Sequence, residues 1–537
     1  MRGLGFARRV PLAASGAMRR FAEDPARGRA ALERAVPGLK AKEKDQDDPA
    51  ARLDRAIALD RYEDACRAFA LIPSDAPERV SCALALDVLS GRLVDAARAR
   101  PTDARARRAQ RAARRQLEVM GQPVVDPPAR PRAHSPVSEG LGVLHVVTNS
   151  LPITQAGSTI RTQRIARAQR DLGWDARVVT RLGYPVTHGD LTSSDPQVID
   201  GVPYHRLLPL VMPAEDRVRE EYAARLGRLV DEVRPHVLHA ASDHVNAAVA
   251  IEVARKRGLP VVYEARTFFE DTWLARHGGE GARESDTFAM LRDRHTEALR
   301  AADAVTTLSE GMRQAIIARG VEPERVFVAP NAVAMNFLEP RDSAAARRHL
   351  GIEDALWIGS VATVNDDEGF HHLVDAVALL RSEGLDVRTL IVGDGPGLPS
   401  LRERAEAAGV PLLAPGRVPV AEVRQWFDVL DIFALPREDT VLNRGVTALK
   451  PLEAQARGIP VVGSNLPAVA EVLAPGSRLV PAGDPAALAE AVRALVDPVV
   501  RAEAGERARA WVEATRTWPS VMGAYRAAYS YLGALTG

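Results

Sequence analysis

One short stretch of the chain combines a lysine, a proline and a glutamate at a spacing that suits a negatively charged ligand. In VTALKPLEAQARGIPVVGS (446–464), Pro451 suits the first helical position, because that position needs no N–H. Lys450 then lies at the helix N-terminus, where its charge and the helix dipole both favour a phosphate. Glu453 in the first turn can accept hydrogen bonds from a ribose diol, or it can simply be an acid that the dipole favours.

A second candidate anion site is the turn Gly157-Ser158-Thr159, which follows the apolar run VLHVVT. Glycine permits a positive φ and a close approach, and Ser158 is a suitable N-cap for the helix that follows. Free N–H groups at a helix N-terminus attract anions. Many such turns bind nothing, so an ordinary strand-to-helix connection is the alternative interpretation.

Both turns belong to a region in which short β-branched runs alternate with helical stretches. This alternation is typical of parallel sheets covered by helices. It predicts an α/β protein with two Rossmann-like domains, at 141–335 and 336–514, that face a cleft at the carboxyl ends of their strands. The predicted strands are 142–148, 175–180, 236–240, 260–264, 304–308 and 325–329, then 356–362, 387–393, 411–414, 431–435, 460–464 and 478–480.

The region in front of these domains has a different composition. Residues 1–120 are rich in Ala, Arg and Leu at helical spacing, which predicts an α-helical N-terminal segment, and 121–140 read as a Pro-rich linker. The stretch Arg98–Arg115 is strongly basic. It is either a contact for anionic lipid headgroups or acidic partners, or an ordinary solvated helix face.

The composition of the whole chain gives no support to several classes of protein. Among 537 residues, 71 Lys and Arg balance 70 Asp and Glu, so charge gives no argument for nucleic acid as a partner. Two cysteines, Cys66 and Cys82, suggest neither a disulfide framework nor a zinc site. The chain has no uninterrupted apolar run of about 20 residues, so any membrane contact is expected to be peripheral. We expect a cytoplasmic protein. If it contacts a membrane, we expect the contact at the inner face of the plasma membrane.

The segment LEAQARGIPVV resembles the nucleotide-binding motif of family-4 (group 1) retaining glycosyltransferases, which commonly read LEAMA-G-PVV there. Further counterparts follow in the family's order over roughly 140–537: GSTIRTQ, VVYEARTFFEDTW, VFVAPNAV, VGDGPG, the GRV segment and LKPLE. The resemblance is greatest to the bacterial enzymes that build surface polysaccharides. It implies a GT-B fold, with a final helix at 515–537 that returns to the first domain, and transfer of a hexose from a nucleotide sugar to a glycan or lipid-linked acceptor. No metal or other cofactor is expected.

The resemblance also implies roles for particular residues. Glu453 would hold the donor ribose and Lys450 the diphosphate, while Arg266 would reach the phosphate or orient the acceptor. The implied catalytic residues are His239, Arg266 and Lys450; the implied donor-binding residues are Gly157, Ser158, Gly416, Arg417, Val418, Asn443, Arg444, Lys450 and Glu453; the implied acceptor-binding residues are Arg266, Phe268, Phe269 and Trp273. The alternative for His239 is a structural role at the end of a strand. The alternative for the three aromatic residues is simple packing.

The chain departs from the family pattern at three places. Thr363 and Glu368 stand at or near positions that carry an Arg and a Lys in many members, within an acidic loop at 366–368. The family's paired glutamate ahead of Glu453 is missing, although Glu438 or Asp439 could replace it from a shifted loop. In HVLHAASDH, Ala241 replaces the second histidine and His244 follows three residues later. These departures motivate a second hypothesis, a catalytically degenerate family member that acts as an assembly or binding partner.

Overall fold

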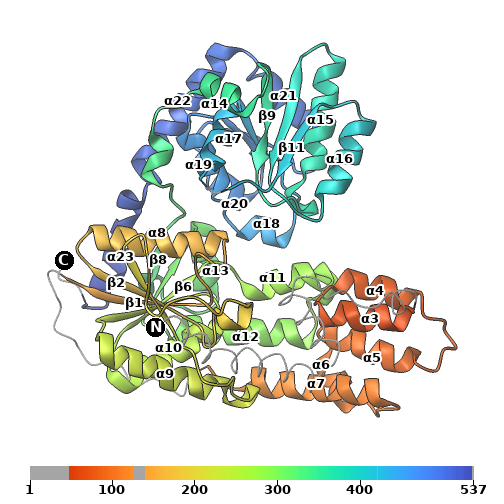
Figure 1. Cartoon of the computed structure of the whole chain (residues 1–537), viewed down its shortest axis with the longest axis vertical. Coiled ribbons are helices and arrows are strands. Elements are labelled where there is room, and N and C mark those ends of the chain that lie inside the picture. The colour runs from red at the N-terminus through yellow and green to blue at the C-terminus, as the bar shows by residue number, and fades with distance from the viewer. Residues whose placement is uncertain (1–47, 125–139, 420, 535–537) are drawn as a thin grey trace. The chain divides into compact units, whose positions relative to one another are not determined.

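The computed structural model describes residues 48–124, 140–419 and 421–534, which divide into two compact units (Figure 1). Unit 1 comprises Met1–Thr306, Ile316–Phe327 and Arg526–Gly537, and unit 2 comprises Thr307–Ala315 and Val328–Tyr525. The N-terminal helices thus belong to unit 1, and the last helix is divided between the units at 525/526. Most of the predicted linker, 125–139, lies outside the described residues.

Unit 1 is built on an eight-stranded sheet with the order β3-β4-β2-β1-β5-β6-β7-β8. The six strands predicted for this region are confirmed, and β1, β2, β4, β5 and β6 pair in parallel. The strands are β1 (Gly142–Val147), β2 (Asp175–Thr180), β3 (Gln197–Ile199), β4 (Val202–Arg206), β5 (Val237–Ala241), β6 (Val261–Ala265), β7 (Ala304–Thr307) and β8 (Val326–Val328).

The hairpin of β3 and β4 is the part of this sheet that the sequence prediction missed. The two strands are antiparallel and joined by Asp200 and Gly201, both with positive φ. An Asp-Gly pair between short β-branched runs is a strong hairpin signal, because both residues tolerate that backbone conformation. The signal was therefore present, but β3 is only three residues long and β4 contains Pro203.

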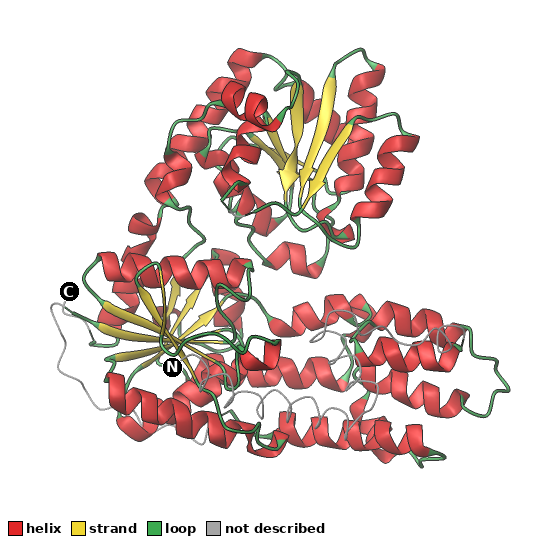
Figure 2. Ribbon diagram, viewed as in Figure 1, coloured by secondary structure: helices red, strands yellow, loops and turns green. Residues whose placement is uncertain are grey.

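Helices cover both faces of this sheet (Figure 2). Side chains of α9, α10 and α12 form the large core on one face with Leu144, Val146 and Leu238 of the strands, whereas α8 packs on the other face against Val178 and Tyr204. The helices are α8 (Gly157–Asp171), α9 (Val218–Val233), α10 (His244–Arg257), α11 (Phe269–Arg276), α12 (Asp286–Ala301), α13 (Glu310–Ala318) and α23 (Trp518–Tyr531), of which α13 and α23 contribute residues to both units.

The described part of the predicted N-terminal segment, from residue 48 on, is helical and docks on α11 and α12 of the same unit, whereas residues 1–47 lie outside the described residues. The amide of Val94 donates to the Asp286 carboxylate (2.8 Å), and the amide of Thr287 donates to the Gly91 carbonyl (3.2 Å). The Trp273 ring lies so close to Gly91 that a Cβ there would be 2.7 Å from it. Its helices are α3 (Pro49–Ala58), α4 (Tyr62–Ala70), α5 (Arg79–Leu89), α6 (Leu93–Arg98) and α7 (Ala104–Gly121).

Unit 2 contains a six-stranded, wholly parallel sheet with the order β11-β10-β9-β12-β13-β14. Counted along the unit this is 3-2-1-4-5-6, the order of a doubly wound nucleotide-binding sheet. All six strands predicted here are confirmed. They are β9 (Leu356–Val361), β10 (Val387–Val392), β11 (Leu412–Gly416), β12 (Ile432–Leu435), β13 (Val461–Ser464) and β14 (Arg478–Val480).

The strands of unit 2 are apolar on both faces because each face is covered by helices. Trp357, Phe433 and Val461 pack against α17, α19 and α22, whereas Ile358, Ile391 and Val462 pack against α15, α16 and α21. The helices are α14 (Ser343–Leu350), α15 (Phe370–Ser382), α16 (Leu398–Ala407), α17 (Val423–Val429), α18 (Val441–Gly445), α19 (Lys450–Ala456), α20 (Pro467–Ala470), α21 (Pro485–Arg493) and α22 (Pro498–Thr515).

Candidate functional site

The strand order of unit 2 reverses between β9 and β12, which are neighbours in the sheet. In open α/β sheets, ligands bind beyond the carboxyl ends of the strands at such a point, because the two following loops diverge there. The loops in question are 362–369 after β9 and 436–449 after β12. The second of these loops leads into α19 with Lys450 and Glu453.

Lys450 and Glu453 form an ion pair in the first turn of α19. The Lys450 Nζ donates to the Glu453 carboxylate over 2.7 Å and lies 5.8 Å from the centre of the Phe427 ring. The Lys450 side chain is 34% exposed, whereas that of Glu453 is only 2% exposed. Lys450, not Pro451 as predicted, is the first helical residue, and Pro451 is the second. The pair therefore presents a cation at the helix start and a carboxylate held beneath it.

Asn443 and Arg444 both have partners within unit 2, and their predicted donor-binding role stays a prediction. Asn443 is buried, and its amide nitrogen donates to the backbone carbonyls of Asp367 (2.8 Å) and Glu438 (3.1 Å). It ties the loop after β9 to the loop after β12. Arg444 is exposed, and its Nε and Nη2 each donate to one carboxylate oxygen of Asp439. Asn443 thus acts as a clamp between loops, and Arg444 already has a carboxylate partner.

The acidic loop 366–368 is partly neutralised by a residue that the sequence analysis overlooked. Both carboxylate oxygens of Glu368 accept from Arg437, at 2.9 and 3.1 Å, and both side chains are largely buried. Arg437 also donates to the Val446 carbonyl (3.2 Å). The signal that could have revealed it is the basic residue in LPRED, directly after a predicted strand and opposite an acidic loop. Glu368 is therefore half of an ion pair across the two loops.

Gly369 allows the same two loops to approach each other at backbone distance. Its φ is +70°, and a Cβ on it would lie 1.9 Å from the Pro436 carbonyl oxygen. A side chain of any size is therefore excluded on two grounds, the left-handed backbone and the space.

We expect Gly369→Ala to destabilise unit 2 by about 2 kcal/mol or more, because the strain of a non-glycine residue at positive φ adds to a backbone clash. Urea unfolding of the purified variant measures this change. Gly409→Ala is the matched control: Gly409 also has a positive φ (+63°), but a Cβ there meets no atom within 4 Å. Equal losses in the two variants would show that the backbone approach to Pro436 contributes nothing.

The residues assigned to the donor base lie at the carboxyl end of β11. Gly416 ends this strand with a φ of +82°, and its carbonyl accepts from the Gly393 amide (2.9 Å). Arg417 is exposed, and Val418 is partly buried against the core of unit 2. This hydrogen bond connects the turn after β10 to the turn after β11. The backbone groups of 416–418 therefore lie at the carboxyl ends of the strands, as do the loops after β9 and β12.

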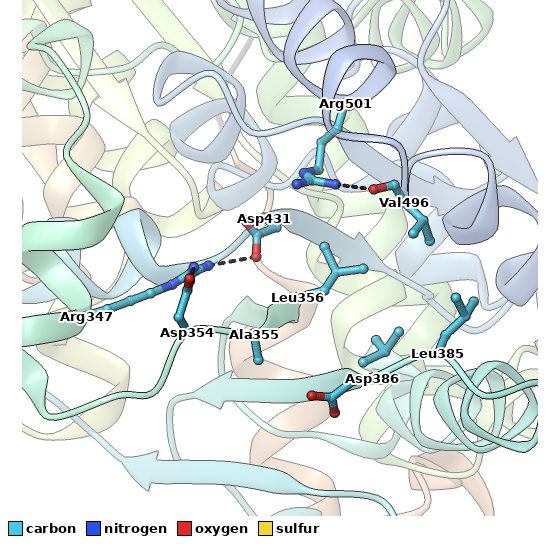
Figure 3. A pocket seen from close by; sticks show the side chains of 10 residues that line it. Arg347, Asp354, Ala355, Leu356, Leu385, Asp386, Asp431, Val496 and Arg501 are labelled. Atoms are coloured by element: carbon cyan, nitrogen blue, oxygen red, sulfur yellow. Dashed lines mark hydrogen bonds and ion pairs between the residues drawn. The ribbon is translucent and has the colours of Figure 1, made fainter.

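A cavity of about 320 Å³ in unit 2 lies at the opposite end of the strands, near their amino termini (Figure 3). Its lining includes Leu356 and Val387, the first residues of β9 and β10, and Asp431, which precedes β12. Arg347 reaches across it to Asp431 (2.7 Å). None of the predicted donor residues lines this cavity, and it faces away from the carboxyl ends of the strands.

In unit 1, the predicted anion turn is the exposed N-terminus of α8. Ala156, not Ser158, is the N-cap, and its amide donates to the Thr159 hydroxyl (3.0 Å). Gly157 is the first helical residue, so a positive φ is not its contribution; a Cβ there would meet no atom within 4 Å. The turn therefore remains open, although Ser158 does not cap the helix.

Arg266 connects this turn to the end of β6. Its guanidinium donates to the Ser158 carbonyl and the Thr162 hydroxyl, both over 2.8 Å, and to the Glu264 carboxylate over 2.6 Å. Glu264 also accepts from Arg161, at 2.7 and 2.9 Å. Burial would raise the pKa of Glu264, yet the charges of Arg266 and Arg161 hold it well below its ordinary value. Arg266 is thus committed to positioning the start of α8.

His239 is fully buried in β5, next to this charged group. Its Nδ1 is 2.7 Å from the Tyr529 hydroxyl of α23, and its Nε2 is 3.5 Å from Glu264. Burial lowers the pKa of His239, which favours the neutral ring. These contacts favour the alternative interpretation of His239 as a strand residue, and a catalytic role for it stays a prediction.

The three aromatic residues assigned to the acceptor are all half-buried. The Arg319 guanidinium lies 4.0 Å above the Phe268 ring. Trp273 stacks on His277 at 4.7 Å and packs against the N-terminal helices, and Phe269 is the first residue of α11. Packing accounts for Phe268 and Trp273, and an acceptor role for any of the three stays a prediction.

The chain has two α/β units, and unit 2 has the strand order of a doubly wound sheet. Each unit carries candidate ligand groups at the carboxyl ends of its strands. Together these features define the GT-B class of fold. Residues 156–332 match the family model of the glycosyl transferase 4-like domain, and residues 353–497 match that of glycosyl transferases group 1. The chain therefore carries both domains of a group 1 glycosyltransferase.

Known proteins agree with this assignment. The chain is 30% identical over 211 residues to 2-deoxystreptamine glucosyltransferase of Streptomyces kanamyceticus, covering 37% of this chain and 53% of that protein. It is 27% identical to D-inositol 3-phosphate glycosyltransferase 1 of Catenulispora acidiphila, covering 64% and 83%. It is 32% identical to the putative colanic acid biosynthesis glycosyltransferase WcaL of Escherichia coli, covering 36% and 48%. The chain thus spans about half the length of the first and third of these relatives.

Solved structures share the fold. Sucrose-phosphate synthase from Thermosynechococcus elongatus superposes with a TM-score of 0.55 at 18% identity, covering 72% of this chain and 99% of that chain. Anabaena HepE in complex with UDP-glucose superposes with a TM-score of 0.54 at 17% identity, covering 72% and 99%. The helices α3–α7 come before the glycosyl transferase 4-like match, which begins at residue 156.

Proposed function

We propose that this chain is a retaining hexosyltransferase that takes its sugar from a nucleoside-diphosphate sugar bound at the carboxyl edge of the unit 2 sheet. The observation that carries the proposal is the Lys450–Glu453 pair at the start of α19. Residues 436–449 connect this helix to β12, where the order of the sheet reverses. A cation at a helix N-terminus suits a diphosphate, and a carboxylate held beneath it suits a ribose diol.

The charge flow of the reaction explains what Lys450 contributes. The bond between the sugar C1 and the diphosphate oxygen breaks, and its electron pair leaves on the diphosphate. The acceptor hydroxyl oxygen forms the new bond to C1, and its proton passes to the departing diphosphate oxygen. Negative charge therefore grows on the diphosphate in the transition state, and a fixed ammonium and helix N–H groups stabilise it more there than in the ground state.

The acceptor is proposed to be a glycan or a lipid-linked molecule of cell-surface polysaccharide or glycolipid synthesis, bound by unit 1. The relatives support the class of reaction but not one acceptor, since their names refer to 2-deoxystreptamine, D-inositol 3-phosphate and colanic acid biosynthesis. In unit 1, the open start of α8 and the Arg266 side chain that holds it are the groups that support this assignment.

The proposal is tested by nucleotide-sugar binding followed by turnover. Purified chain is titrated with UDP-, GDP- and ADP-sugars by calorimetry, and the best donor is then incubated with a panel of glycan and lipid-linked acceptors. We expect one donor to bind and to release its nucleoside diphosphate together with a glycosylated product, whose anomeric configuration by NMR matches that of the donor. Absence of binding by every donor would exclude the function, and inversion of the anomeric centre would exclude retention.

A catalytically degenerate member is the second candidate, and the acidic loop 366–368, where the family resemblance would place a cation at or near Glu368, favours it. This candidate predicts that a Glu453→Ala chain restores the phenotype of a deletion strain. Failure of that variant to restore the phenotype, despite normal abundance, would rule it out.

Membrane contact through Arg98–Arg115 also stays a proposal. At least three of its arginines are engaged within unit 1: Arg105 with Asp54 (2.9 Å), Arg114 with the Ala97 carbonyl (3.0 Å) and Arg115 with Glu215 (2.5 Å). Arg107 and Arg111 are exposed on α7. No helix among residues 48–124, 140–419 and 421–534 has the length and apolarity to cross a bilayer. Co-sedimentation with anionic vesicles, lost in an Arg107→Glu/Arg111→Glu variant, is the expected result, and equal sedimentation of both proteins would contradict it.

A further inference from the structure

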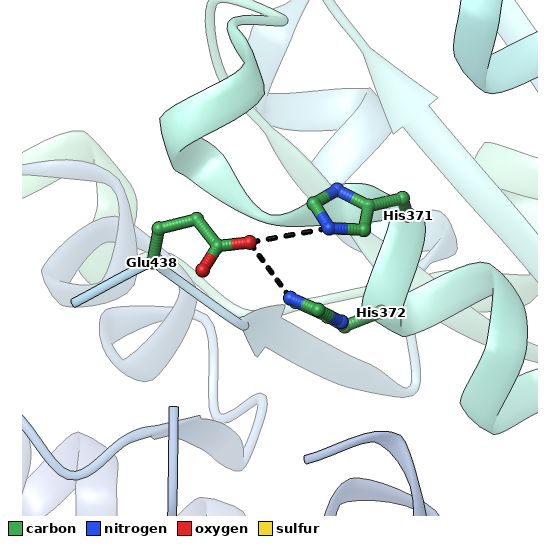
Figure 4. A group of neighbouring side chains, drawn as sticks. All are labelled: His371, His372 and Glu438. Carbon is green, nitrogen blue, oxygen red and sulfur yellow. Dashed lines mark hydrogen bonds and ion pairs between the residues drawn. The ribbon is translucent and has the colours of Figure 1, made fainter. Parts of the chain in front are cut away.

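Two adjacent histidines of α15 face one glutamate of the loop after β12 (Figure 4). The Nε2 of His372 is 2.7 Å from Glu438 Oε1, and the Nε2 of His371 is 3.1 Å from the same oxygen. The candidate donor atoms of the three residues all lie within 4.8 Å of one another. Neither histidine was considered in the sequence analysis, and neither is used by the proposed transfer reaction.

We propose that His371, His372 and Glu438 form a binding site for a divalent transition-metal ion of the zinc class. Two imidazole nitrogens and one carboxylate are a ligand set that zinc and related ions use, with further positions left for water. Imidazole ligands argue against magnesium and calcium, which take oxygen ligands. A small shift of each side chain away from the shared contact would admit an ion among the three atoms.

The backbone that carries these ligands is held rigidly, which is what a metal site needs. The Glu438 amide donates to the Asp367 carbonyl (3.0 Å), and the Glu438 carbonyl accepts from the buried Asn443 amide (3.1 Å). Gly369 brings the start of α15 against Pro436 at backbone distance. The histidine pair and the glutamate therefore come from two segments that are already fastened together.

The side chains themselves are oriented in a way that packing alone does not require. The two imidazole rings lie 4.0 Å apart at 45°, so that two neighbouring side chains of one helical turn direct the same ring atom to one point. All three side chains are partly exposed, at 37%, 16% and 33% for His371, His372 and Glu438, so an ion can enter from solvent. A bound ion would fasten the loop after β12, which leads to Lys450, to the first turn of α15.

The inference is tested with metal alone, in the absence of any nucleotide or sugar, so that its outcome is independent of the transfer activity. Full-length chain is stripped with a chelator, titrated with Zn²⁺ by calorimetry, and loaded with Co²⁺ to record its visible absorption. We expect one equivalent of Zn²⁺, and affinity weakened by a factor of about 10–100 or more in both His372→Ala and Glu438→Gln, since each removes a ligand. His349→Ala, which removes an exposed histidine of α14, should bind as wild type does.

Two results would overturn the inference. One is a wild-type chain that takes up no stoichiometric Zn²⁺; the other is unchanged affinity in both ligand variants. Thermal melting in chelator distinguishes a lost ligand from a misfolded protein, because a folded His372→Ala chain melts as wild type does without metal. Glu438→Asp provides a second check, since it keeps a carboxylate and should retain Co²⁺ absorption with altered intensity.

Discussion

Replacement of Lys450 by alanine is expected to lower kcat/KM for glycosyl transfer by about 10²–10³-fold, the usual effect of removing one group that stabilises transition-state charge. The Nζ of Lys450 occupies the start of α19, where it pairs with Glu453 over 2.7 Å. Because charge on the diphosphate grows as the sugar departs, most of the loss should fall on kcat and a smaller part on donor affinity. Steady-state kinetics with the donor identified by calorimetry measures both quantities.

Two controls separate this role from a general loss of positive charge or of folding. Arg348→Ala removes an exposed cation of α14 in the same unit and should change kcat/KM less than twofold. Thermal melting is needed because Glu453, at 2% exposure, loses its ion-pair partner in the Lys450→Ala chain. A folded Lys450→Ala enzyme with wild-type kcat would contradict the assignment of Lys450 to the leaving diphosphate.

The fold was largely predictable because its strands are short apolar runs punctuated by helices, and all twelve predicted strands are present. Two features of the fold escaped prediction, one because its strands are short and one because it depends on a contact between distant parts of the sequence. The Asp200-Gly201 hairpin is formed by strands too short to stand out from loops. The place of the N-terminal helices was also not predictable, because their docking depends on a hydrogen bond between Val94 and Asp286, 192 positions apart in the sequence.

The sequence could predict those contacts of the candidate site that form within the first turn of one helix. Lys450 and Glu453 lie within one turn, so their spacing alone brings them together, and the structure pairs them. Glu368 lies after β9, whereas Arg437 and Asn443 both lie after β12, and their contacts depend on how these two segments meet. A motif shows which residues are present there but not which of them have already found partners within the protein. The sequence did not show the partners of Asn443 and Arg444, and their donor roles stay predictions.

Replacement of Glu264 by glutamine is expected to destabilise unit 1 by about 3–5 kcal/mol, because it leaves two buried guanidinium groups without their shared carboxylate. Glu264 is fully buried and accepts from Arg161 (2.7 Å) and from Arg266 (2.6 Å). The glutamine amide keeps the size of the side chain but directs an N–H group toward one of these donors. Urea unfolding at pH 7 measures the loss. Asp171→Asn, which breaks the exposed Arg167–Asp171 pair of α8, should cost no more than about 0.5 kcal/mol.

The pH dependence of this loss identifies its cause. The pKa of Glu264 is well below its ordinary value of 4.5 in the folded chain, so the folded state holds the carboxylate ionised while the unfolded state takes up a proton as the pH falls below 4.5. The stabilisation by Glu264 is therefore complete above that pH and declines below it, by about 1.4 kcal/mol for each pH unit until the folded pKa is reached. The stability difference between wild type and Glu264→Gln should accordingly narrow by about 2 kcal/mol between pH 4.5 and 3. A difference that stays constant over this range would mean that the variant is destabilised by altered packing, and that the charge of Glu264 does not hold Arg266 at the start of α8.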